Sequence, residues 1–276
     1  MATGTTPTTP VPEANGVRAH GRASIAARHL RTDRWWVPPL VTALGLAAFV
    51  AYATWRAFAN SDYYAAPYVS PFYSPCLASN CTDMKAGADW HLFGDWWGLS
   101  PALLVLVFPL GFRLTCYYYR KAYYRGIWWS PPACAVAEPH EKYTGETRFP
   151  LILQNIHRYF FYLALIVAGI LTYDTVLGFR DQDGNWGHMG LGTVVLLLNI
   201  ALIWAYTVSC HSCRHVIGGK LRHFSKHPVR YRLWNWVGAL TARHMLLAWS
   251  SLISVGVADL YVYLVASGAF DDPRFF

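Results

Sequence analysis

A short segment of the chain is dense in side chains that bind metals. Cys210, His211, Cys213 and His215 lie within one run, SCHSCRH. On a continuous helix the side chains of Cys210 and Cys213, spaced i and i+3, would point the same way. Thiolates and imidazoles are ligands of zinc, of iron–sulfur clusters and of haem iron. The segment therefore predicts a metal-binding or redox site.

Three further ligand-type residues lie at the edges of apolar segments. Cys116 ends one such segment, while His157 and His244 lie near the start of two others. If these segments cross a membrane, all of these residues share one depth, and intramembrane polar groups usually mark a site. Two histidines on facing helices could hold haem b, whereas two cysteines with two histidines could hold zinc or a Rieske-type [2Fe–2S] cluster.

The elements that must position these residues are long apolar helices. The chain has 276 residues, of which 54% are hydrophobic and 14% charged. Ordinary soluble domains carry about 25% charged residues, so a soluble domain is disfavoured. A helix needs about 20 mostly apolar residues to cross a bilayer. Five stretches qualify and predict an all-α integral membrane protein: 36–55, 97–116, 151–173, 189–209 and 244–267.

The flanking segments complete the predicted domain organisation. Residues 1–34 are rich in Thr, Pro, Ala and Arg and predict a disordered basic tail. Residues 35–270 form the five-helix membrane domain, and residues 271–276 form a short C-terminal tail.

The net charge of +8 separates into two sides of a membrane. Segments 1–34, 113–150 and 210–243 hold five, six and seven Lys and Arg residues, and the last holds no acid. The other three loops hold four in total. Because positive residues accumulate on the cytoplasmic side, we expect a cytoplasmic N-terminus and an extracytoplasmic C-terminus. The basic charge is thus explained by topology, and a nucleic-acid partner is excluded.

Two cysteines lie on the predicted outer side. Cys76 and Cys81 belong to the loop sequence PFYSPCLASNC. Disulfides persist in oxidising compartments, so this pair is a disulfide candidate.

Five spans, a basic inner face and redox-type ligands at the inner helix ends resemble the single-chain, cytochrome b-type membrane anchor of succinate dehydrogenase. The strings PFYSPCLA and SCHSCRH are most similar to the actinobacterial form of this anchor, and the resemblance covers about residues 30–270. It implies a component of a succinate:quinone oxidoreductase in the bacterial plasma membrane. A flavoprotein with FAD and an iron–sulfur subunit would dock on it, and electrons would pass to a quinone, by expectation menaquinone. The chain itself would carry electrons without oxidising succinate.

One departure from the wider family guides the choice of cofactor. Anchors with two haems place axial histidines on their first, second, fourth and fifth spans, but here the first span has none. We therefore favour a Rieske-type cluster, with Cys210 and Cys213 on one iron and His157 and His244 on the other. Haem b stays the alternative cofactor. The reserve ligands are Cys116, His211 and His215. Quinone carbonyls need hydrogen-bond donors, so Arg158, Tyr159, Tyr206 and Arg243, which lie near the same level, are the candidate quinone-binding residues.

Other classes of membrane protein remain as alternatives. A five-helix cytochrome b-like protein or a metal-binding scaffold would use the same ligands. A small transporter is disfavoured, because transporters often show matched repeats and none is visible.

Overall fold

The computed structural model describes residues 32–59, 61–74, 101–137, 139–140, 147–149, 151–181 and 183–276. Nearly all of the predicted N-terminal tail, the disulfide candidates Cys76 and Cys81, and the first residues of the second predicted span lie outside them. The chain forms two compact units. One comprises Met1–Ala43 with Ala122–Tyr143, and the other Leu44–Lys121 with Thr144–Phe276.

Long apolar helices dominate the described residues, as the composition predicts. Four are long and apolar enough to cross a membrane: Val37–Ala59, Ile152–Leu177, Leu191–Val208 and His244–Ala266. They correspond to α1 (Val37–Ala59), the 3₁₀ turn Leu151–Ile156 with α4 (His157–Leu177), α5 (Leu191–Val208) and α8 (His244–Ala266). The remaining predicted span contains α2 (Pro101–Thr115), which has 15 residues in the described part of the chain; residues 97–100 of that span lie outside it. The all-helical prediction is confirmed, and four of its five spans are found.

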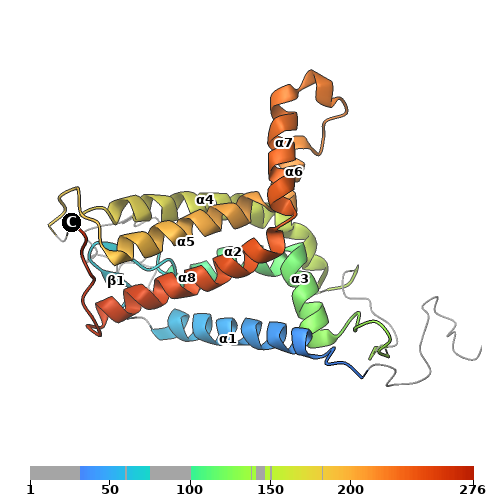
Figure 1. Ribbon diagram of the computed structural model, residues 1–276, viewed down its shortest axis with the longest axis horizontal. Helices are drawn as coiled ribbons and strands as arrows, with labels where there is room; N and C mark the ends of the chain where they lie inside the picture. Colours follow the sequence, from blue (N-terminus) through green and yellow to red (C-terminus); the bar gives the residue numbers. More distant parts are fainter. Residues whose placement is uncertain are drawn as a thin grey trace, which may run out of the picture. The chain divides into compact units, whose positions relative to one another are not determined.

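The larger unit is a bundle in which α5 packs on α8 and α4 packs on both α2 and α5 (Figure 1). Alanines such as Ala164, Ala168 and Ala248 are buried, which lets the helix backbones approach closely. Large apolar side chains such as Leu198 and Ile253 are exposed instead. An apolar outer face suits a lipid surround.

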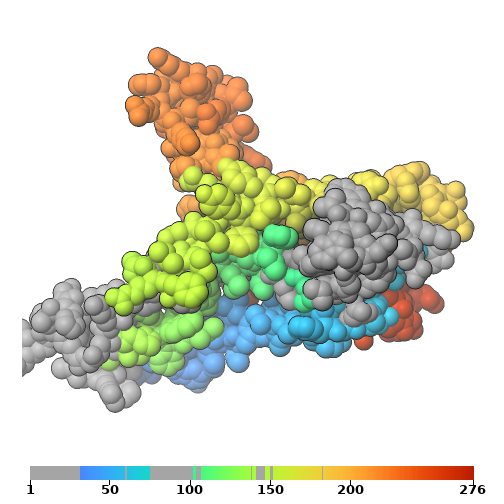
Figure 2. All heavy atoms as spheres, turned by 180° about the vertical axis from the view of Figure 1, so that it is seen from behind, coloured from blue at the N-terminus to red at the C-terminus, as the bar shows by residue number. Residues whose placement is uncertain are grey.

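The basic segment 210–243 folds into a helical hairpin. It contains α6 (His211–Gly218), the 3₁₀ turn Phe224–Lys226 and α7 (Pro228–Thr241). The hairpin stands out from the helix bundle of its unit, drawn in orange in Figures 1 and 2. Arg214 lies 4.0 Å above the ring of Trp234, and a Cβ at Gly218 would meet that ring at 2.4 Å. Close packing and a cation–π contact therefore join the two helices.

The described connecting segments contain further short elements. In the larger unit, strands β1 (Tyr64–Ala65) and β2 (Tyr68–Val69) pair antiparallel. Helix α3 (Tyr117–Tyr123) follows α2 and leads into a π-helical turn, Tyr124–Trp128.

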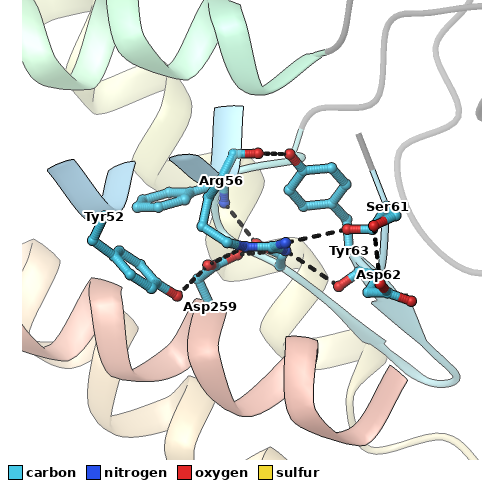
Figure 3. Close-up of polar contacts among 8 residues, drawn as sticks. Tyr52, Arg56, Ser61, Asp62, Tyr63 and Asp259 are labelled. Atoms are coloured by element: carbon cyan, nitrogen blue, oxygen red, sulfur yellow. Dashed lines mark hydrogen bonds and ion pairs between the residues drawn. The ribbon is translucent and has the colours of Figure 1, made fainter. Parts of the chain in front are cut away.

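A buried ion pair joins α1 to α8 at the ends far from His244 (Figure 3). Arg56 Nε donates to Asp259 Oδ2 at 2.8 Å, and both side chains are fully buried. Tyr52 and Ser70 also donate to the Asp259 carboxylate. Arg56 in turn donates to the carbonyls of Ser61 and Asp62. Asp259 is the only Asp, Glu, Lys or Arg residue in α8, and the ion pair neutralises its charge within the bundle.

The C-terminal residues pack against the start of α5. The amide of Leu191 donates to Pro273 O, and the amide of Phe275 donates to Met189 O. Asp272 accepts hydrogen bonds from the Gly192 amide and from the Tyr68 hydroxyl. Burial raises the pKa of Tyr68 to about 12, so this hydroxyl keeps its proton and donates. The predicted C-terminal tail is thus tied to the bundle.

Candidate redox centre

Four helix ends bring two thiols and two imidazoles together inside the larger unit. Cys116 directly follows α2, His157 is the first residue of α4, Cys210 caps the start of α6, and His244 is the first residue of α8. Cys116, Cys210 and His244 are 1%, 2% and 6% exposed, and His157 is partly buried. These residues come from positions up to 128 apart in the sequence, so only the packing of the helices gathers them.

The four side chains form two thiol–imidazole pairs. Cys116 Sγ lies 3.2 Å from His244 Nε2, and Cys210 Sγ lies 3.0 Å from His157 Nε2. In each histidine the other ring nitrogen contacts a hydroxyl. Ser209 Oγ lies 2.7 Å from His244 Nδ1, and Thr115 Oγ1 lies 2.8 Å from His157 Nδ1. Each imidazole is therefore oriented by a hydroxyl at Nδ1 and presents Nε2 to a sulfur, as in sites where a second contact orients a metal ligand.

Aromatic rings enclose the pairs. The Phe112 ring stacks on His157 at 4.9 Å between centroids, and the Tyr206 ring stacks on His244 at 5.1 Å. Phe112 and Tyr206 contact each other at 5.5 Å. Burial raises the pKa of the Cys210 thiol to about 12, so the free thiol is protonated and would release its proton on binding a metal.

The donor set of two thiols and two imidazoles can be compared with the metal centres that use these ligands. Among the described residues, no three His, Cys, Asp or Glu side chains surround one point, as a tetrahedral zinc would need. Two thiols and two imidazoles are the ligands of a Rieske-type cluster, which takes them in pairs on two irons. Here each contact joins a thiol to an imidazole, so iron would have to replace these contacts.

The predicted ligands Cys210, His157 and His244 come together with Cys116, which the sequence offers only as a reserve. Cys213 is partly buried beside the hydrophobic core around Cys116 and Cys210. Its predicted alignment with Cys210 assumed one continuous helix. Helix α5 ends at Val208, and Cys210 has the extended backbone of a helix cap (φ −67°, ψ 145°). The i, i+3 rule therefore does not apply.

The other two reserve ligands lie on the surface. His211 and His215 are exposed on α6. His211 contacts the ring of Tyr117, and His215 Nδ1 lies 3.3 Å from an Arg158 nitrogen.

The predicted quinone residues divide into two groups. Arg158, Tyr159 and Arg243 are exposed, so they belong to the surface beside the centre. Tyr206 is 2% exposed, and its hydroxyl has no hydrogen-bond partner among the described residues.

An apolar cavity lies beside Tyr206. It is lined by residues of α1, α2, α4, α5 and α8 and by Pro71 and Phe72. Its polar lining side chains are Arg113, Tyr206 and Thr207. Most of its lining is apolar, as is usual for sites that bind small molecules. An apolar body with a polar head group would match this lining.

Arg113 is a residue of this site that the sequence reasoning missed. The residue is 9% exposed, and its guanidinium donates to Tyr119 Oη at 2.9 Å and to Ser251 Oγ at 2.7 Å. Its position in the sequence could have pointed to it: Arg113 lies within an apolar span, three residues before Cys116, and charged residues inside a membrane usually mark a functional site.

The fold and site define a multi-pass helical membrane protein with buried thiols and imidazoles at one end of its bundle. Residues 37–268 match the family described as actinobacterial succinate dehydrogenase subunit SdhC, and the chain belongs to this family. The resemblance inferred from the sequence is confirmed.

A solved structure supports this assignment. A chain of the Mycobacterium smegmatis Sdh1 complex in the apo form is 56% identical, with a TM-score of 0.83. The alignment covers 94% of this chain and 98% of that chain. No curated protein matches significantly.

Proposed function

We propose that the chain anchors a succinate:quinone oxidoreductase and relays electrons from its iron–sulfur subunit to a quinone. The observation that carries this proposal is the meeting of Cys116, His157, Cys210 and His244 as two pairs, at 3.2 and 3.0 Å. Family membership supplies the reaction, and the apolar helices supply the membrane setting. By the positive-inside rule this end of the bundle is cytoplasmic, in a bacterial plasma membrane.

The proposed cofactor is a Rieske-type [2Fe–2S] cluster held by those four residues. Such a cluster supplies one-electron transfer at a higher potential than a cluster held by cysteines alone. The protein orients the imidazoles through Ser209 and Thr115 and excludes water with Phe112 and Tyr206. Burial of the ligands limits access of solvent to the centre.

Haem b, the alternative cofactor, fits the geometry less well. An axial pair would place a porphyrin between His157 and His244. The rings of Phe112 and Tyr206 stack on these histidines and contact each other. Both rings would have to leave before a macrocycle could enter.

The basic α6–α7 hairpin is proposed as part of the docking surface for the iron–sulfur and flavoprotein subunits. Segment 210–243 holds seven Lys and Arg residues and no acid. Because complementary charge steers association, an acidic face on a partner would be attracted here.

The quinone is proposed to enter the cavity lined by Tyr206. A buried hydroxyl without a partner is costly, and a quinone carbonyl would accept its hydrogen bond. The apolar lining would hold the ring and the start of the isoprenoid chain. Menaquinone, expected from the actinobacterial family, is the proposed substrate.

A comparison of two cysteine variants tests the ligand set. We expect Cys116→Ala to abolish the EPR signal of the anchor's cluster in the dithionite-reduced complex. Cys213→Ala, a matched change in a partly buried thiol, should retain it. Iron and acid-labile sulfide in the complex should fall together in Cys116→Ala alone.

The opposite pattern, with loss in Cys213→Ala and retention in Cys116→Ala, would restore the ligand set expected from sequence. A haem-type visible spectrum that disappears in His157→Ala would overturn the cluster.

A further inference from the structure

Arg113 is a deeply buried cation that no carboxylate balances in the described part of the chain. Its guanidinium donates to Tyr119 Oη, Ser251 Oγ and the Ala248 carbonyl, all of which are neutral. Arg56, which is fully buried, is by contrast paired with Asp259. Burying a charge without a partner is costly, so Arg113 calls for a source of negative charge nearby.

The residue lies directly beside the proposed centre. Arg113 Cζ is 4.7 Å from the centroid of the Tyr206 ring, which itself stacks on His244. The carbonyl of Arg113 accepts a hydrogen bond from the amide of Cys116. The Tyr206 ring therefore separates the guanidinium from His244, and one helical turn separates Arg113 from Cys116.

We infer that Arg113 provides the positive charge that compensates the electron while it resides on the buried centre. The inference rests on the proposed function. With a cluster bound, an electron would pass from the reduced iron–sulfur subunit to the centre, and no bond would form or break. The added negative charge would lie in a medium of low dielectric, where a nearby cation stabilises it strongly. Arg113 thus raises the reduction potential and favours transfer from the partner subunit.

Arginine suits this role because its planar guanidinium carries a delocalised positive charge and several N–H donors in a fixed geometry. Its hydrogen bonds to Ser251 and Ala248 fix it between α2 and α8. Salt screens buried charges weakly, so the effect should persist at high ionic strength.

Potentiometric EPR titration of the whole complex, without added quinone, tests the inference. We expect Arg113→Gln to lower the equilibrium constant for one-electron reduction of the anchor's centre at least tenfold, which corresponds to 59 mV for one electron. Arg113→Lys keeps the charge and should stay within threefold of the wild type. Equal shifts in both variants would show that only the packing of Arg113 matters and would overturn the inference.

A second pair of variants tests the charge while Arg113 remains. Ser251→Asp places a carboxylate beside the guanidinium, and Ser251→Asn is nearly isosteric but neutral. We expect the aspartate variant to lower the equilibrium constant severalfold more than the asparagine variant does. If the EPR signal is absent in Arg113→Gln, the two Ser251 variants provide the test instead. Equal equilibrium constants for one-electron reduction in Ser251→Asp and Ser251→Asn would overturn the inference.

The two proposals fail in different ways. A wild-type complex without any signal that Cys116→Ala removes would overturn the proposed function. A signal that depends on Cys116, with a reduction potential that is the same in the wild type, in Arg113→Gln and in Ser251→Asp, would overturn only the role of Arg113.

Discussion

At the scale of single residues, the two imidazoles of the centre share one arrangement. Each contacts a hydroxyl through Nδ1 and a thiol through Nε2, although His157 and His244 lie on different helices. A hydroxyl at Nδ1 fixes the orientation of the ring, so the second nitrogen is already aimed before a metal binds.

Loss of one of these hydroxyls should weaken binding of the cofactor. We expect Ser209→Ala to lower affinity for the cluster about 10- to 100-fold, the usual effect of removing a contact that orients a ligand. The rate of iron loss to a chelator measures this. Ser267→Ala removes an exposed hydroxyl at the opposite end of α8 and serves as the control. Equal rates in the two variants would contradict the role of Ser209.

The buried hydroxyl of Tyr206 gives a second prediction at this scale. We expect Tyr206→Phe to raise KM for quinone roughly three- to tenfold, the value of one lost hydrogen bond. Because that hydroxyl has no partner within the described residues, its removal should not lower the free energy of unfolding. Steady-state kinetics and denaturant unfolding in detergent measure the two effects. Tyr173→Phe, at an exposed position on α4, should change neither. An unchanged KM in Tyr206→Phe would place the quinone elsewhere.

At the scale of elements, the Arg56–Asp259 pair fixes α1 against α8 (Figure 3). The two residues are 203 positions apart and fully buried. A buried pair is weak evidence of net stabilisation, but loss of one partner leaves an uncompensated charge. The pair therefore specifies how α1 packs on α8.

Removal of one charge from this pair should be severe. We expect Asp259→Asn to lower the free energy of unfolding by about 3–5 kcal/mol. Denaturant titration of the purified complex in detergent measures it. Asp62→Asn makes the same change in a side chain that bonds only at the surface and should cost little. The double variant Arg56→Met with Asp259→Leu should recover most of the loss. A double variant as unstable as Asp259→Asn would contradict this account.

At the scale of the whole molecule, exposed basic residues gather on the α6–α7 hairpin. The α6–α7 hairpin carries exposed Lys220, Arg222 and Lys226, whereas Arg274 lies near the opposite end of α8. Exposed charges steer association and are screened by salt, so a docking role should be salt-dependent.

Neutralisation of the hairpin should weaken assembly of the complex. We expect the triple variant Lys220→Gln, Arg222→Gln and Lys226→Gln to retain less flavoprotein than the wild type on co-purification. The difference between the two should be larger at low salt than at high salt. Arg274→Gln, a change of one basic residue near the other end, should retain the wild-type amount. Full retention by the triple variant at every salt concentration would exclude these three charges from docking.

The sequence by itself determined the apolar helices, the basic segment 210–243 and the presence of ligand-type residues near the ends of apolar segments. The length of an apolar segment and the clustering of basic residues are local properties of the sequence, so they can be recognised without knowing how the helices pack. Only the tertiary structure decided that Cys116 joins Cys210 and the two histidines, because a helix break at Cys210 removes the alignment expected of Cys213. The positions of Arg113 and of the Arg56–Asp259 pair also came from packing. Contacts between distant helices depend on how the bundle closes, and no local pattern records that.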